Sequence, residues 1–197
     1  MVVVTQFTQM PNPTVQEQVE ALTTVAKKLS AEGKEVQALE AYKTAAGLMP
    51  GAPWLQHRTA ELARKHQQVE AAALHYRRAA AAFIGAGFPK RALAPLRMAW
   101  QVSLALLPGQ AGVLVTIALE LANVQRELGF VADAKLTLSN TNQAFKASGS
   151  PERVPSAGEF ELRSTRAPSE PPESGVKGLA QAAAQGMMSR LQTAVKP

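Results

Sequence analysis

Three histidines lie close together in this 197-residue sequence, and imidazole is the side chain best suited to bind metal or move protons near neutral pH. His57 and His66 are nine residues apart in a segment that we expect to be one helix. That separation places them on nearly opposite sides, because each helical residue turns the chain by about 100°. We therefore expect His57, His66 and His75 to be partly exposed helix residues. We predict no metal site and no cofactor.

Other residue patterns of catalysis are missing from the sequence. The chain has no cysteine, which excludes disulfide bonds, thiolate catalysis and zinc–cysteine sites. It has no glycine-rich phosphate loop, no serine nucleophile elbow and no zinc-protease helix. We find no pair of carboxylates beside a histidine or a nucleophile. We therefore predict that the protein is not an enzyme and has no catalytic residues.

Positive charge is concentrated in the middle of the chain. The net charge is +6, and residues 57–97 contain eight arginines and lysines but only two glutamates. We expect a basic patch, which would be formed by Arg77, Arg78, Lys90 and Arg91. Such a patch fits an acidic protein surface, and nucleic acid is the less favoured interpretation. A solvated helix face without a ligand explains the same charge, because Arg and Lys are good helix formers.

Apolar residues recur at intervals of three and four along most of the chain, which is typical of amphipathic helices. The first helix begins at a capping box formed by Thr14 and Glu17 and ends before Gly33. We expect further helices at residues 34–48, 54–66, 69–85, 90–106, 110–128 and 131–146. Pro95 lies inside the expected helix at 90–106, so that helix either begins near Ala94 or is kinked.

One pattern of small and aromatic residues occurs twice. Its spacing is Ala-x3-Tyr-x2-Ala, and the copies at residues 38–45 and 72–79 are 34 residues apart. A stripe of this kind lets a helix approach a neighbour closely at two points while the ring fills the space between them. Because the pattern returns at a fixed period, it indicates a repeated helical hairpin.

The helical part of the chain resembles an array of tetratricopeptide (TPR) repeats, whose unit is a hairpin of 34 residues. Within residues 19–52, Gly33 matches the glycine between the two helices and Pro50 matches the closing proline. The last unit keeps Gly129 but has Thr141 where a second small residue is expected. The resemblance implies an all-α fold, a TPR-like right-handed solenoid of about seven antiparallel helices over residues 13–147.

The spacing shortens in the middle of this array. Gly87 and Ala92 repeat the offset from glycine to alanine, but Ala92 follows Ala72 by only 20 residues. We therefore expect the helix at 69–85 to pair both with the helix before it and with the helix after it.

In TPR arrays the first helices of the hairpins form a concave groove that binds a partner. The resemblance implies that the groove residues are Thr23, Lys27, Trp54, His57, Glu61, Arg64, Lys65, Thr116, Asn123 and Arg126. This mixture of cationic, amide and aromatic groups fits an acidic or amphipathic segment of a protein partner. The family's two-carboxylate clamp is not expected, because Thr23 and Lys27 stand where it needs lysine and asparagine.

Two tryptophans are candidate recognition residues. Trp54 follows Pro53 at the start of a helix, where we expect the indole to pack against the turn. Trp100 lies between Ala99 and Gln101, close to Val102, and we expect it in the core.

The two ends of the chain differ from its helical middle. We expect residues 1–12 to be a flexible lead-in without the features of a secretory signal, and no run of eighteen apolar residues is present. We therefore expect a cytoplasmic protein without a membrane span. Residues 148–175 are rich in proline and serine, which predicts a disordered linker. Two Arg-x-Pro-Ser sequences, at 153–156 and 166–169, are candidates for a basophilic kinase.

The last segment, residues 176–197, is predicted to be a short amphipathic helix. Its candidate docking residues are Leu179, Met187, Met188 and Leu191. They would bind a second partner or the groove of the same chain, since repeat arrays need their apolar ends covered.

These observations predict a non-catalytic adaptor or scaffold that binds a partner peptide or protein in its TPR groove. A close alternative is an assembly or secretion chaperone that uses the same groove. A further alternative is a nucleic-acid-associated regulatory factor that uses the basic middle helices, and its binding would weaken steeply with salt.

Overall fold

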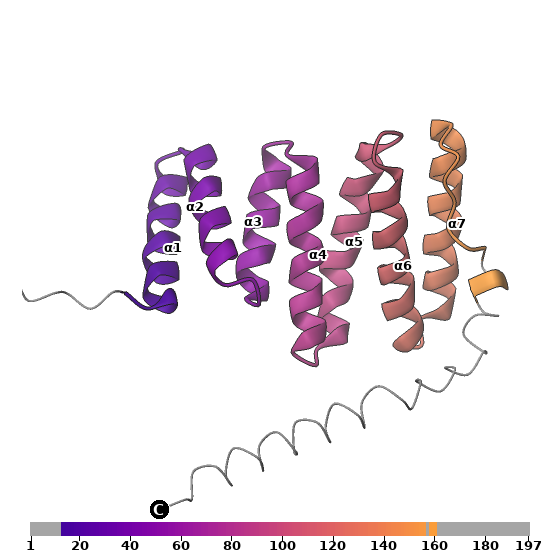
Figure 1. The fold of residues 1–197 in the computed structure, drawn as a ribbon, viewed down its shortest axis with the longest axis horizontal. Helices are drawn as coiled ribbons and strands as arrows, with labels where there is room; N and C mark the ends of the chain where they lie inside the picture. The colour runs from indigo at the N-terminus through magenta and orange to yellow at the C-terminus, as the bar shows by residue number, and fades with distance from the viewer. Residues whose placement is uncertain (1–12, 157, 161–197) are drawn as a thin grey trace, which may run out of the picture. The chain divides into compact units, whose positions relative to one another are not determined.

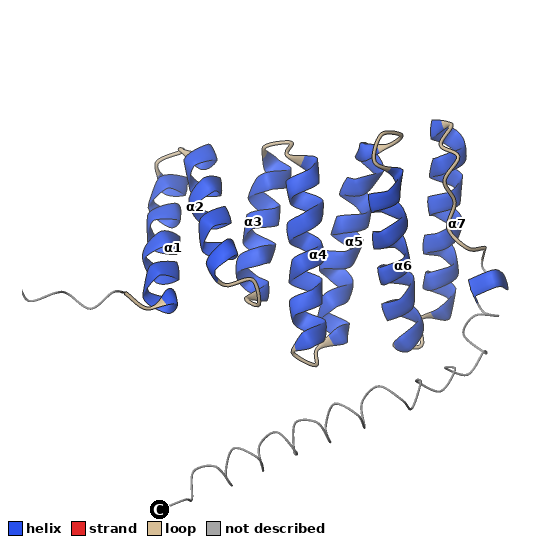
Figure 2. Cartoon of the chain, in the orientation of Figure 1, coloured by secondary structure: helices blue, strands red, loops and turns tan. Residues whose placement is uncertain are grey.

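The computed structural model describes residues 13–156 and 158–160. The described residues are all-helical, without a strand (Figures 1 and 2). The elements are α1 (Val15–Ala31), α2 (Glu35–Leu48), α3 (Pro53–Lys65), α4 (Val69–Gly85), α5 (Pro89–Ser103), the 3₁₀ helix η1 (Leu104–Leu106), α6 (Ala111–Glu127) and α7 (Val131–Ser148). The expected lead-in at 1–12 and the expected docking helix at 176–197, with Leu179, Met187, Met188 and Leu191, lie outside the described residues.

The helix boundaries follow from local chemistry. The predicted capping box is confirmed: the backbone N–H of Thr14 donates to the Glu17 carboxylate at 2.7 Å, and the N–H of Glu17 donates to the Thr14 hydroxyl at 3.3 Å. Left-handed residues end α1, α4 and α6, at Gly33, Gly87 and Gly129, with φ angles of 75°, 81° and 84°. Glycine adopts this conformation without the steric cost that a Cβ atom brings.

The connection between α3 and α4 has the same geometry without a glycine. Gln67 has a φ of 56°, and it lies 34 residues after Gly33, at the equivalent place in the repeat. The N–H of Gln67 donates to the carbonyl of Arg64 at 3.1 Å, and the N–H of Gln68 donates to that of Ala63 at 2.9 Å. The hydrogen bonds of the turn are therefore kept, and Gln67 alone adopts the unfavourable backbone angle.

Consecutive helices run in opposite directions and lie side by side in chain order (Figure 1). The repeated alanine and tyrosine positions are all buried, and Tyr42 and Tyr76 keep 3% and 1% of their surface exposed. Small side chains on both sides of each ring let neighbouring helices approach closely. Helix α4 packs extensively against both α3 and α5, which confirms the expected double pairing of this helix.

Polar contacts also join helices that are two apart in the chain. The guanidinium of Arg77 on α4 binds the carboxylate of Glu120 on α6, with N–O distances from 2.5 to 2.9 Å. On the other side, the indole Nε1 of Trp100 on α5 donates to the Thr141 hydroxyl on α7 at 2.9 Å. Helices α4 and α6 thus share one layer, and α5 and α7 share the opposite layer.

Helix α5 differs from its prediction. It begins at Pro89 and continues through Pro95 to Ser103, so a start near Ala94 is wrong. Pro89 suits the first position, where a helix has no use for the missing N–H. Pro95 removes one backbone hydrogen bond from the helix interior, but the residue itself is buried. The expected single helix over 90–106 ends earlier and is followed by η1.

The described start of the predicted linker is folded against α7. Gly149 has a φ of 69°, and the N–H of Ser150 donates to the carbonyl of Phe145 at 3.0 Å. Asn142 then binds the backbone of Val154 twice, accepting from its N–H at 2.9 Å and donating to its carbonyl at 3.0 Å. Val154 keeps only 1% of its surface exposed. The rest of the predicted linker lies outside the described residues, except for 158–160, which are helical.

Candidate binding surface

A shallow hollow lies between α3 and α5. Its volume is about 510 Å³, and it is lined by Trp54, His57, Arg58, Glu61, Phe83, Arg91, Ala94 and Pro95. Trp54 is 55% exposed, so the expectation that it packs against the turn is wrong. Its place in the first turn of α3, behind Pro53, points the ring away from the buried Leu55 and Gln56.

Charged groups of both signs surround this indole. Arg58 donates to the Glu61 carboxylate at 3.2 Å, and His57 Nδ1 lies 3.8 Å from the same carboxylate. From α5, the guanidinium of Arg91 stacks over the Phe88 ring, 5.0 Å from its centroid. The hollow is lined by two arginines, Arg58 and Arg91, and one carboxylate, that of Glu61.

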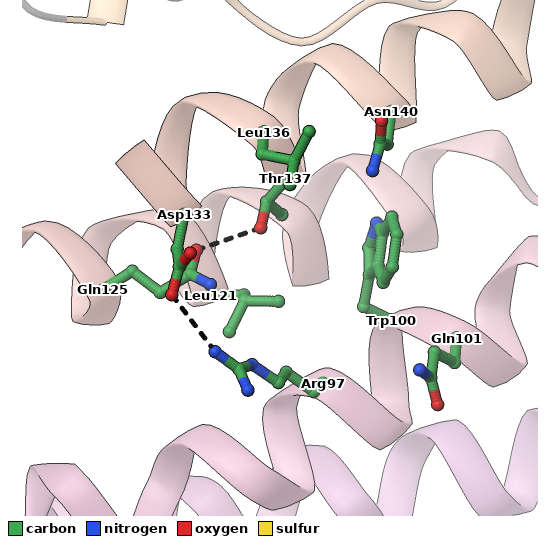
Figure 3. Close-up of a pocket in the computed structure, with 9 residues that line it drawn as sticks. All are labelled: Arg97, Trp100, Gln101, Leu121, Gln125, Asp133, Leu136, Thr137 and Asn140. Carbon is green, nitrogen blue, oxygen red and sulfur yellow. Dashed lines mark hydrogen bonds and ion pairs between the residues drawn. The ribbon is translucent and has the colours of Figure 1, made fainter. Parts of the chain in front are cut away.

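A second, smaller hollow of about 170 Å³ lies between α5 and α7 (Figure 3). Arg97 on α5 donates to the Asp133 carboxylate on α7 at 3.3 Å, and Thr137 donates to Gln125 at 3.0 Å. Figure 3 shows the Trp100 indole with the amides of Gln101 and Asn140 on its two sides. Side-chain amides offer both a donor and an acceptor, which is the pairing that a peptide main chain needs.

The two hollows are joined by one stripe of α5. Ala94, Arg97 and Gln101 are exposed and follow one another at helical spacing, and each of them lines one of the hollows. We call this surface the α3–α5–α7 face. It consists of Trp54, His57, Arg58, Glu61, Arg91, Ala94, Arg97, Gln101, Asp133 and Asn140.

The structure divides the predicted groove residues. It brings Trp54, His57 and Glu61 together in the first hollow. Lys27 and Arg64 are exposed but line neither hollow, and Lys65 binds Glu35 of α2 at 2.5 Å.

Thr23 does not provide a groove contact, because only 6% of its surface is exposed and its hydroxyl donates to the Glu20 carbonyl. Its position on α1 turns it toward the core, where Val19 and Ala26 are also buried.

The predicted groove residues of α6 lie in the other layer. Asn123 lines a hollow shared with α4, and it accepts a hydrogen bond from Arg126 at 3.1 Å. The hydroxyl of Thr116 donates to the carbonyl of Gly112 on its own helix. The physical reason is that consecutive helices alternate between the two layers. Because α4 closes one hairpin and opens the next, α6 lies beside α4 in one layer, and α5 lies beside α3 in the other.

The predicted basic patch is also divided. Arg77 is neutralised by Glu120, Arg78 lines the hollow between α4 and α6, and Arg91 lines the one between α3 and α5. Lys90 is exposed and lines neither of them. The local excess of positive charge in the sequence is therefore shared between two surfaces.

The expectation of partly exposed histidines is wrong for His75. Its ring is 6% exposed, and Nδ1 lies 2.7 Å from Oε1 of Gln56, a residue that is fully buried. Burial, together with the nearby cations Arg78 and Lys43, lowers the pKa of His75 to about 4. The buried pair is a packing feature of the α3–α4 contact. The described residues contain no cluster of three or more metal-binding side chains.

Sequence reasoning missed the part of the face that α5 and α7 contribute, chiefly Arg97, Gln101, Asp133 and Asn140. The signal was present in the shortened spacing between Ala72 and Ala92. If one helix serves two hairpins, every later helix changes layer, and the exposed positions of α5 and α7 then lie in the same layer as those on α3.

Comparisons with known proteins give a weak structural likeness. No protein-family model matches the sequence, and no curated protein matches it. Among solved structures, the crystal structure of BtubC (BKLC) from P. vanneervenii is similar with a TM-score of 0.39 and 14% sequence identity. The match covers 75% of this chain and 70% of that one. A likeness at this level assigns neither a family nor a function.

We compared the length and hydropathy of the described helices with those of membrane-spanning helices. None of the helices within 13–156 is both long enough and apolar enough to cross a lipid bilayer.

Proposed function

We propose that this protein is a non-catalytic adaptor, a TPR-type right-handed solenoid that binds an acidic or amphipathic segment of a protein partner on its α3–α5–α7 face. The observation that carries the proposal is the exposed Trp54, which lies in an open hollow beside Arg58 and Arg91. An exposed indole next to guanidinium groups is the composition found at energetic centres of protein interfaces. Covering the ring would release water, and the guanidinium of Arg91 would pair with a carboxylate of the partner.

The second hollow extends the same surface. Gln101 and Asn140 present amide groups beside Trp100, and these can hydrogen-bond to an extended main chain without regard to its side chains. A segment that crosses α5 from one hollow to the other would meet the exposed indole of Trp54 at one end and the amides of Gln101 and Asn140 at the other.

The nucleic-acid alternative has less support. Such binding depends on several free cations along one surface, because its affinity comes largely from phosphate contacts. Arg77 is already paired with Glu120, and Arg58 with Glu61. Of the other cations, Arg78 and Arg91 line two different hollows, and Lys90 lines neither of these.

The proposal is tested by quantitative affinity purification with the full chain and the double variant Trp54→Ala, Arg91→Glu. We expect the variant to lose the proteins that the native chain captures, while its helical circular dichroism is unchanged. The matched control is Lys90→Glu, which reverses a neighbouring exposed charge outside both hollows. If the double variant captures the same partners in the same amounts, the α3–α5–α7 face is not the binding surface.

A further inference from the structure

A third and larger hollow lies on the opposite layer. Its walls are α4 and α6, its floor includes Leu96 of α5, and its volume is about 690 Å³. We call it the α4–α6 groove. It shares no residue with the α3–α5–α7 face.

The groove exists because α4 has small side chains at its centre. Ala80 and Ala81 lie between two large apolar residues, Leu74 and Ile84, which are 44% and 43% exposed. Leu74 and Ile84 are ten residues apart, which corresponds to about 15 Å along a helix. Val124 of α6 completes the apolar lining. The result is a trough about three helical turns long, which is apolar at Leu74, Ile84 and Val124 and is crossed by the ion pair between Arg77 and Glu120.

The shape of the trough favours a helix over an extended strand. Both walls are helices whose interior backbone N–H and C=O groups are already hydrogen-bonded. An extended strand would therefore find no free backbone groups to pair with. A partner helix with apolar residues at every third and fourth position would place a matching stripe between the two walls.

Charges define the two walls. Arg77 and Glu120 bind each other across the groove, which leaves Arg78 on the α4 wall and Glu127 on the α6 wall. None of the ion pairs within residues 13–156 involves Arg78 or Glu127. A complementary occupant therefore carries a carboxylate on one flank of its apolar stripe and a cation on the other.

We propose that the α4–α6 groove docks an amphipathic α-helix of a partner protein, whose apolar stripe covers Leu74 and Ile84 and whose acidic flank pairs with Arg78. This site goes beyond the function proposed above, since it lies on the other layer and takes a helix. The chain would then hold two protein segments at once, one on each layer.

The test uses the full chain and a synthetic amphipathic peptide of about 18 residues, with leucines along one face, glutamates on one flank and lysines on the other. A peptide of the same composition with its leucines distributed around the helix is the control probe. Titration calorimetry should show one peptide bound per chain, and the control probe should bind at least about tenfold more weakly.

Two variants locate the site. Ile84→Lys puts a charge into the trough and is compatible with folding, because a cation near a helix C-terminus is favourable. It should weaken binding by at least about tenfold, whereas Val36→Lys, at an exposed apolar position of α2, should have no effect. Arg78→Glu should weaken binding by about fivefold at low salt and less at high salt. Trp54→Ala should leave this binding unchanged, which separates it from the adaptor face.

Several outcomes would overturn the proposal. These are no binding of the leucine-stripe peptide up to about 1 mM, or equal binding by native chain and Ile84→Lys. Self-association of the native chain that Ile84→Lys abolishes would assign the groove to a second copy. Tighter binding of a peptide of residues 176–197 than of the synthetic probe would assign it to the chain's own sequence.

Discussion

Gln56 of α3 and His75 of α4 form a buried hydrogen bond of 2.7 Å. Nε2 of Gln56 donates to the Ala46 carbonyl of α2 at 2.9 Å, so Oε1 is left as the acceptor for His75. Nδ1 of His75 must therefore carry a proton and donate it. These hydrogen bonds connect three consecutive helices, α2, α3 and α4. The His75 ring that donates to Gln56 is neutral.

The first prediction concerns the pH dependence of stability. The pKa of His75 is about 4 in the fold and 6.5 in the unfolded chain, so the unfolded chain binds more protons between these values. The contribution of His75 is present above pH 6.5 and is lost as the pH falls toward 4. The loss amounts to roughly 3 kcal/mol of unfolding free energy. Urea unfolding at a series of pH values should show this decrease in unfolding free energy between pH 6.5 and 4, and His75→Gln should lack it. Identical slopes for both chains would contradict the assignment.

The second prediction concerns Gln67. Gln67→Gly should stabilise the protein by about 1 kcal/mol, because glycine removes the steric cost of the left-handed backbone. The matched variant is Gly33→Gln, at the equivalent turn between α1 and α2, which should destabilise by a similar amount. Thermal and denaturant unfolding measure both. A destabilising effect of Gln67→Gly would show that its side chain contributes more than its backbone costs.

The third prediction concerns Thr141, the threonine that replaces a small residue in the last repeat. Thr141 is fully buried, accepts from Trp100 Nε1 and donates to the Thr137 carbonyl at 2.7 Å. Thr141→Val keeps the shape but leaves the indole N–H without its acceptor, which should cost about 1–3 kcal/mol. Thr141→Ser should cost less. Unfolding curves followed by Trp100 fluorescence, in a Trp54→Phe background, measure both. Equal costs for valine and serine would exclude the hydrogen bond as the cause.

The fourth prediction concerns the segment after α7. Asn142→Leu should remove both hydrogen bonds to Val154 and release residues 150–156 from α7. Hydrogen exchange of the Val154 amide should become much faster, while α4 and α5 keep their protection. Asn140→Leu, on the same helix but with an exposed side chain, is the control. Unchanged exchange at Val154 in Asn142→Leu would mean that other contacts hold the segment.

Helix positions were largely predictable from the sequence because strong local signals mark them. The expected range of α4, 69–85, agrees with the structure, since apolar periodicity and the Gly85–Pro89 breaker act on the same few residues. The burial of Tyr42 and Tyr76 followed from their 34-residue repeat. Trp54, His57 and Glu61 share a hollow because one helix face positions all three.

Contacts between helices that are two apart in the chain could not be predicted from the sequence. The layer of α6 depends on how many hairpins use α4, and an error there moves Thr116, Asn123 and Arg126 to the wrong surface. Gln56 fits the TPR pattern poorly and yet is fully buried. Its burial is possible only because Ala46 and His75 provide partners from α2 and α4, and no local pattern reports such partners.

The contacts between Arg77 and Glu120 and between Trp100 and Thr141 have a mechanical consequence. In a row of helices joined only to their nearest neighbours, pulling on the ends peels off one helix at a time. These two contacts overlap, because α4 is tied to α6 and α5 to α7, so α4 to α7 must yield together. Under tension, α4 to α7 would therefore rupture in a single step instead of one helix at a time.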